Sequence, residues 1–142
     1  MRRICVRSYK TSEAIVKTVM IDTSILIEFY RKTDKANSAW FKLVGQQYDF
    51  VISSITKYEI YSGATENQLK FWNDVLKKIK VIPFDENSVD AAISINKKLK
   101  LKRKQISHAD LFIAATAVAH NLPFVTLNKK HFERVEALKM IE

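Results

Sequence analysis

Cysteine and long apolar runs are both scarce in this chain. The only cysteine is Cys5, which excludes an intramolecular disulfide and a cysteine-based zinc site and favours a reducing compartment. The longest uncharged apolar run, 111–119, is less than half of the ~20 residues that span a bilayer. Near the N-terminus, Arg7, Lys10 and Glu13 interrupt the apolar stretch that a signal peptide needs. We therefore expect a soluble, cytoplasmic protein without membrane association.

Glycine and proline are also rare, with two of each in 142 residues, so we expect one domain with few turns. Short β-branched runs alternate with longer segments of helical apolar spacing. The expected strands are 18–21, 50–52, 80–82, 124–126 and 139–141, and the expected helices are 23–31, 37–46, 55–63, 67–79, 87–101 and 108–120. Such alternation predicts an α/β fold with a parallel sheet covered on both faces. In helix 87–101, the spacing of Val89, Ala92, Ile93 and Leu99 predicts the buried face.

Basic residues are in excess. The chain has 24 Lys and Arg against 15 Asp and Glu, a formal net charge of +9. This excess favours a polyanionic partner, either nucleic acid or an acidic protein segment. Residues 1–18 are expected to form a basic N-terminal extension, and residues 19–142 the folded domain.

Three acidic residues stand outside the usual solvated surroundings. Asp22 follows the first expected strand, at the edge where open α/β sheets bind ligands, although Asp is also a favoured helix cap. Glu59 shares a helical face with Ile55, and its alternatives are an exposed position or an ion pair with a lysine. Asp110 completes a Ser-x-x-Asp pattern before an apolar run, which also describes a capping box.

Together these acids point to a shared site. If the first strand is central, Asp22, Glu59 and Asp110 can converge at the carboxyl edge of the sheet. Three unpaired carboxylates would repel one another, so a divalent cation is their natural partner. Mg²⁺ suits oxygen ligands and substrate phosphate, and it activates a bound water for attack on phosphorus. The residues thus indicate metal-assisted phosphodiester hydrolysis.

The motifs around these acids resemble a known family. They are Asp22-Thr23-Ser24 after a hydrophobic strand, Ser53-Ser54-Ile55-Thr56-x-x-Glu59-Ile60, Asp110-Leu111-Phe112-Ile113-Ala114-Ala115-Thr116-Ala117 and Pro123-Phe124-Val125-Thr126-Leu127-Asn128. In order and spacing they resemble PIN domains, in particular the VapC toxins of type II toxin–antitoxin pairs. The resemblance runs from about Val19 to the C-terminus.

This resemblance carries expectations for fold, chemistry and partners. It implies a three-layer α/β/α fold with a five-stranded parallel sheet, dependence on Mg²⁺ or Mn²⁺, and endonucleolytic cleavage of RNA such as tRNA or rRNA. It also implies a homodimer that a small cognate antitoxin neutralises. By motif position, Asp22, Glu59 and Asp110 are the catalytic, metal-binding acids, and Thr23 and Thr126 are supporting residues.

One acid of the family pattern is missing. Family members often carry a fourth acid after the last motif strand, where this chain has Thr126-Leu127-Asn128 followed by Lys129, Lys130 and His131. The amide oxygen of Asn128 can bind a hard cation but adds no charge, so a second metal site is expected to be weak.

Cations near the expected site are candidates for RNA phosphate contacts. They are Lys57, Lys102, Arg103, Lys104, Lys129 and Lys130. The alternative is an ordinary solvated helix end, since Lys and Arg favour the last turn of a helix. Phosphate contacts give salt-dependent affinity with little sequence choice.

Two other functions fit parts of the sequence. One is a non-catalytic PIN-like RNA-binding module that has lost turnover together with the fourth acid. The other is a different metal-dependent phosphotransfer domain, such as a receiver or a haloacid-dehalogenase-like phosphatase. The receiver needs an acidic pair before its phosphoacceptor and the phosphatase needs Asp-x-Asp, and Asp22-Thr23-Ser24 supplies neither.

Overall fold

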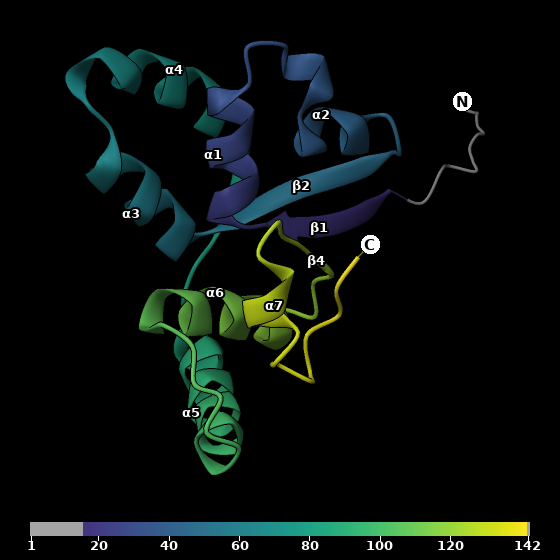
Figure 1. The fold of residues 1–142 in the computed structure, drawn as a ribbon, viewed down its shortest axis with the longest axis vertical. Helices are drawn as coiled ribbons and strands as arrows, with labels where there is room; N and C mark the ends of the chain where they lie inside the picture. Colours follow the sequence, from purple (N-terminus) through teal and green to yellow (C-terminus); the bar gives the residue numbers. More distant parts are fainter. Residues whose placement is uncertain (1–15, 142) are drawn as a thin grey trace, which may run out of the picture.

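A parallel sheet lies at the centre of the computed structural model, which describes residues 16–141 (Figure 1). Its four strands in that range are, in sheet order, β3 (Lys80–Ile82), β2 (Tyr48–Ser53), β1 (Lys17–Ile21) and β4 (Phe124–Val125). All neighbouring pairs are parallel, and Met20 on β1 pairs with Val51 on one side and Phe124 on the other. The first strand is therefore central, as the sequence argument requires.

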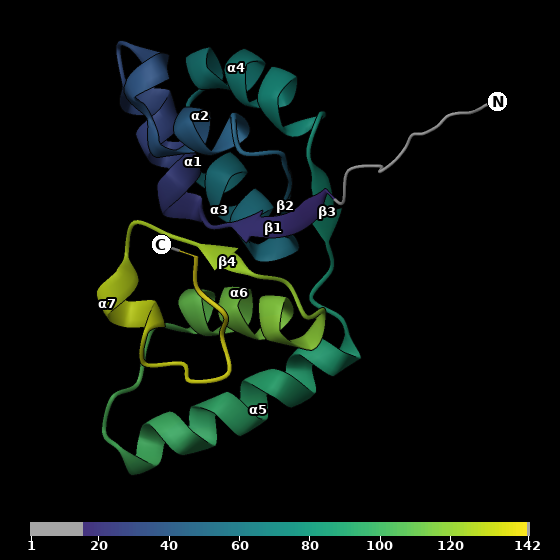
Figure 2. The same cartoon turned by 90° about the vertical axis from the view of Figure 1, so that its right-hand side faces the viewer.

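Helices cover both faces of the sheet, so the α/β/α expectation is confirmed (Figure 2). One layer holds α1 (Thr23–Arg31), the short 3-10 helix η1 (Lys35–Asn37), α2 (Ala39–Val44) and α4 (Glu66–Leu76). The other holds α5 (Glu86–Leu101), α6 (His108–Ala119) and α7 (Lys129–Phe132). Helix α3 (Ser54–Gly63) follows β2 directly and contacts both α4 and α6.

The alternation of β1 explains the two layers. Met20 packs into the core cluster beneath α5 and α6, whereas Val19 and Ile21 pack into the cluster beneath α1 and α4. All three side chains are fully buried. Because successive strand residues point to opposite faces, one short strand anchors both layers and fixes the position of the residue that follows it.

The fifth strand expected at 139–141 is reduced to a single bridge. Phe124 and Met140 form an isolated parallel bridge, so this segment lies at the sheet edge beside β4. The backbone N–H of Phe124 donates to the carbonyl of Lys139 at 2.8 Å, and that of Ile141 donates to the carbonyl of Phe124 at 2.9 Å. With β4 itself only two residues long, the partner segment has little strand to pair with.

Three details of the helices differ from the expectations. The helix expected at 37–46 is shorter, because α2 begins only after Ser38, whose hydroxyl caps it by accepting the backbone N–H of Phe41 at 3.2 Å. The short helix η1 lies before it. The buried face predicted for α5 was partly wrong, since Val89 and Ile93 are 39% and 55% exposed. Helix α5 packs through the predicted Ala92 and Leu99 together with Ser88 and Ile95. Helix α7 was not expected.

The N-terminal expectation falls largely outside the described residues. Residues 1–15 of the expected basic extension are not described, and β1 begins at Lys17, two residues before the expected boundary. Within residues 16–141, every helix is too short or too polar to cross a membrane.

Candidate active site

Asp22 is a buried carboxylate at the carboxyl end of the central strand. It is 4% exposed and caps α1, with its Oδ1 accepting the Ile25 backbone N–H at 3.3 Å and the Ser24 hydroxyl at 2.6 Å. Its Oδ2 accepts the Thr126 hydroxyl at 2.6 Å. The predicted cap is therefore present, and the same carboxylate also lies at the sheet edge where α/β folds bind ligands.

Burial raises the pKa of Asp22 above its ordinary value of 3.8. The hydrogen bonds from Ser24, Thr126 and Ile25 lower the pKa, and the nearby carboxylate of Asp110 raises it further. The net direction means that the hydrogen bonds do not fully replace the lost hydration of the charged form. A cation bound by Asp22 and Asp110 would stabilise both carboxylates in their charged form and so offset the rise.

The loop after β4 is tied to Asp22 by hydroxyl groups. The Thr126 hydroxyl, which donates to Asp22, also accepts the backbone N–H of Asn128 at 2.9 Å. The Ser24 hydroxyl, which donates to the other carboxylate oxygen, accepts the backbone N–H of Leu127 at 3.1 Å. Each hydroxyl thus binds the acid and positions the loop at once, so the loop conformation depends on the carboxylate.

Glu59 reaches the same edge through Thr23. The Thr23 hydroxyl donates to Glu59 Oε1 at 2.6 Å and lies 3.1 Å from the Thr56 hydroxyl oxygen. Glu59 is half-buried on α3, and Thr23 is the residue directly after Asp22. The structure therefore joins Glu59 to the Asp22 region through an intervening side chain.

Asp110 lies in the first turn of α6 and faces α7. Its backbone N–H donates to the Ser107 hydroxyl, the cap of α6, at 3.2 Å. Its side chain is 22% exposed, and Oδ2 lies 3.4 Å from Nδ1 of His131. The amide nitrogen of Asn128 lies 2.9 Å from the same imidazole nitrogen. Asn128 and His131 thus line the Asp110 side of the site.

The carboxylate oxygens at this edge fit a hard divalent cation that is held by few protein ligands. Within residues 16–141, no group of three or more His, Cys, Asp or Glu side chains is arranged to hold a metal ion. Mg²⁺, however, is commonly held by one or two carboxylates, several waters and substrate phosphate. The electrostatically coupled pair Asp22 and Asp110 meets that requirement.

The predicted phosphate-contact cations occupy three places. Lys57 lies on α3, Lys129 and Lys130 lie on α7, and the other three end α5 or follow it. All six are exposed. Lys102 is held by Glu136, with 2.7 Å between Nζ and Oε2, and this pairing lowers the pKa of Glu136.

Two residues of the site had no predicted role. Ser24 donates to Asp22, and Thr56 lies beside the Thr23 hydroxyl. An Asp followed two residues later by Ser at a helix start was the signal for Ser24, because the first helical turn places that hydroxyl near the cap carboxylate. Nothing near Thr56 in the sequence indicates its neighbour, since Thr23 lies 33 residues away.

Comparison with known proteins supports the family and the fold that the sequence motifs predicted. The profile of the PIN domain family matches residues 19–138. The chain is 33% identical over 119 residues to Ribonuclease VapC1 of Methanocaldococcus jannaschii, which covers 83% of this chain and 81% of that protein. It is 32% identical over 131 residues to Ribonuclease VapC1 of Rickettsia felis, covering 87% of this chain and 94% of the relative.

Solved structures resemble the fold over nearly its whole length. VapBC-1 from nontypeable Haemophilus influenzae superposes with a TM-score of 0.77 at 24% identity, covering 88% of this chain and 97% of the other. DNA-bound VapBC from Salmonella typhimurium gives 0.75 at 25% identity, covering 89% and 98%. The chain therefore belongs to the PIN-domain family. Within that family, its sequence places it among the VapC ribonucleases.

Proposed function

We propose that this chain is a divalent-metal-dependent endoribonuclease that hydrolyses phosphodiester bonds in tRNA or rRNA. The observation that carries the proposal is the buried Asp22 at the end of the central strand, whose pKa is raised by burial and by Asp110. Two carboxylates kept close together at a ligand-binding edge are costly unless a cation joins them. The VapC ribonuclease relatives support RNA as the substrate.

Each residue of the site has a distinct task in this proposal. Asp22 and Asp110 hold the cation, Mg²⁺ with Mn²⁺ as a substitute, and the Asn128 amide is a further oxygen ligand. When bound, such a cation lowers the pKa of a water and offsets charge that develops on the phosphate. Glu59 is the third predicted metal-binding acid, and the hydroxyl of Thr23 orients its carboxylate. Thr126 and Ser24 hold Asp22 in place.

The proposed partner is a small cognate antitoxin, with this chain acting as the toxin. Structural neighbours that are VapBC complexes support this part, as does the VapC identity of the sequence relatives. A homodimer is also proposed, because the motifs resemble those of VapC toxins. Induced expression in a host without the antitoxin should arrest growth, and Asp22→Asn should relieve the arrest. Equal arrest by both proteins would contradict a toxic role for the nuclease site.

Cleavage is tested by incubating purified protein with a pool of tRNA and rRNA in Mg²⁺, Mn²⁺ or EDTA. Discrete fragments are expected with either metal and none with EDTA. Asp22→Asn, Glu59→Gln and Asp110→Asn should each abolish the fragments. Asp74→Asn is the matched control, because Asp74 is an exposed acid on α4 paired with Lys70 at 3.2 Å. Full cleavage by the three site variants would refute the assignment.

A second candidate function is a PIN-like module that binds RNA without turnover. The presence of Asn128, where the family pattern often has an acid, favours it. It predicts RNA binding without fragments in either metal. In that case Asn128→Asp should restore cleavage, because it supplies the missing charge.

A further inference from the structure

A basic groove lies beside the candidate active site, where the end of α5 meets α7. We call it the α5–α7 groove. Its walls are formed by Lys102, Lys104, Lys130, Glu133, Arg134 and Glu136. Four of the six are cations, and they come from two segments that are far apart in the sequence. Only the fold brings these charges together.

The two chain segments that form the walls of the groove also contact Asp110. One wall continues from Lys104 to Ser107, which caps the helix that carries Asp110. The other contains Lys130, whose neighbour His131 lies 3.4 Å from Asp110 through Nδ1. Arg134 holds the walls together, since its Nη1 donates to the carbonyl of Gln105 at 3.1 Å. The groove and the candidate catalytic edge therefore share two elements, the segment that leads into α6 and helix α7.

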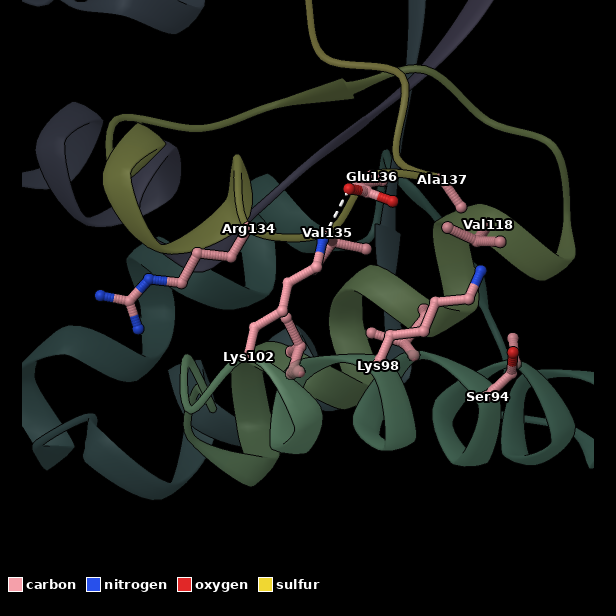
Figure 3. Close-up of a pocket in the computed structure, with 11 residues that line it drawn as sticks. Ser94, Lys98, Lys102, Val118, Arg134, Val135, Glu136 and Ala137 are labelled. Atoms are coloured by element: carbon pink, nitrogen blue, oxygen red, sulfur yellow. Dashed lines mark hydrogen bonds and ion pairs between the residues drawn. The ribbon is translucent and has the colours of Figure 1, made fainter.

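One cation of the groove, Lys102, forms an ion pair with Glu136 of the same chain. The Lys102 ammonium and Glu136 are 2.7 Å apart, and Lys98 adds to the positive field around Glu136. Figure 3 shows this pair at the end of α5, with Arg134 on one side of Lys102 and Lys98 on the other. Both side chains are exposed, at 48% and 69%, so the pair can open without uncovering a buried charge.

We propose that the α5–α7 groove binds the phosphate backbone of the RNA beside the scissile bond, and that Glu136 weakens this binding by holding Lys102. This inference rests on the proposed ribonuclease function and adds where the substrate lies. The contacts of both wall segments with Asp110 favour RNA over an acidic peptide as the occupant, because a substrate strand must pass the candidate catalytic edge. The cations give affinity through counterion release, which is independent of base sequence.

The test measures binding of a labelled oligouridylate in EDTA across a salt series, with Asp22→Asn as the background to prevent turnover. Replacing both Lys104 and Lys130 by Gln removes two phosphate contacts. The slope of log K against log salt should fall by about 1.4, and affinity at 0.1 M salt by about 25-fold relative to a 1 M reference. Lys42→Gln with Lys80→Gln is the matched control, on α2 and at the start of β3, and should change affinity far less.

The substitution Glu136→Gln should change RNA affinity in the opposite direction. It frees Lys102 for one more phosphate contact, so affinity at 0.1 M salt should rise by about 5-fold and the slope should steepen by about 0.7. A folding defect weakens binding and cannot imitate this gain. The proposal is overturned if Glu136→Gln leaves affinity unchanged or lowers it, or if the control pair loses as much as the groove pair.

Two further measurements separate this inference from the proposed function. Polyglutamate replaces RNA in the same assay, and tighter binding of polyglutamate that depends on the groove lysines would assign the groove to an acidic protein segment and overturn the RNA assignment. Cleavage by the wild-type protein is scored independently. Groove-dependent RNA binding without any fragments would refute the nuclease and leave the groove assignment standing.

Discussion

The hydroxyl of Thr126 should contribute strongly to stability, because it makes two hydrogen bonds at the candidate active site. Thr126 is 2% exposed, and its hydroxyl donates to Asp22 Oδ2 at 2.6 Å while accepting the Asn128 N–H at 2.9 Å. Valine has nearly the same shape, so Thr126→Val removes both bonds with little change in packing. A hydrogen bond to a charged group contributes about 1.5–3 kcal/mol, and the orphaned N–H adds about 1 kcal/mol.

The expected loss of stability is therefore about 2.5–4 kcal/mol, which corresponds to a fall in Tm of roughly 10 °C for a domain of this size. Thermal unfolding at neutral pH measures it. Thr116→Val is the matched control, because Thr116 is fully buried and its hydroxyl donates only to the Phe112 carbonyl of its own helix, at 2.7 Å. That neutral bond is worth about 1 kcal/mol.

The dependence on charge is tested in a second background. In Asp22→Asn the carboxylate is absent, so Thr126→Val should cost only about 1–2 kcal/mol there, from the orphaned Asn128 N–H and a neutral hydrogen bond to the amide. Lowering the pH should have the same effect in the protein that retains Asp22. The stability lost by Thr126→Val is largest above the folded-state pKa of Asp22, and it shrinks as protonation removes the charge. Equal costs of Thr126→Val in both backgrounds would refute the reasoning that the hydroxyl stabilises the buried charge.

Three further predictions follow from the same structure. Asp22→Asn should raise Tm in EDTA, because the raised pKa shows that the site disfavours the charge and Asn caps helices as well as Asp does. A lower Tm of Asp22→Asn in EDTA would contradict this expectation. The substitution should also abolish the increase in stability that Mg²⁺ gives the native protein, which is about 2.7 kcal/mol at a Mg²⁺ concentration of 100 times Kd. Ser107→Ala should lower stability by about 1 kcal/mol in urea titrations, whereas Ser107→Asp should not, because the cap of α6 is lost only in the first. Arg103 has φ 55, so Arg103→Gly should stabilise by roughly 0.5–1 kcal/mol, and an unchanged urea midpoint would show that this backbone is unstrained.

The sheet and its ligand-binding edge were predictable from local pattern. The strand at 18–21 is short, β-branched and followed by an acid, and it lies at the centre of the sheet as expected. Asp22 and Asp110 also have the predicted helix-terminal positions. These features depend on side-chain periodicity and on caps within a few residues, which a sequence displays directly.

Errors arose where packing between distant segments decided the outcome. Val89 and Ile93 fit a helical stripe, yet α5 turns Ala92 and Ile95 toward α6 and leaves the first two exposed. The spacing of apolar residues allows more than one buried face, and only the partner helix selects between them. The segment at 139–141 likewise pairs through one bridge because β4 is so short.

The sequence by itself determined the fold class, the family and the identity of the acids at the sheet edge, because each depends on residue type and local spacing. Tertiary structure alone decided that Thr126 donates a hydrogen bond to Asp22, 104 residues away, and that Glu136 pairs with Lys102, 34 residues away. Partners so far apart leave no periodic signal in the chain. Hydrogen bonds and ion pairs act over a few ångströms of space, so their partners are fixed only when the strands and helices have packed.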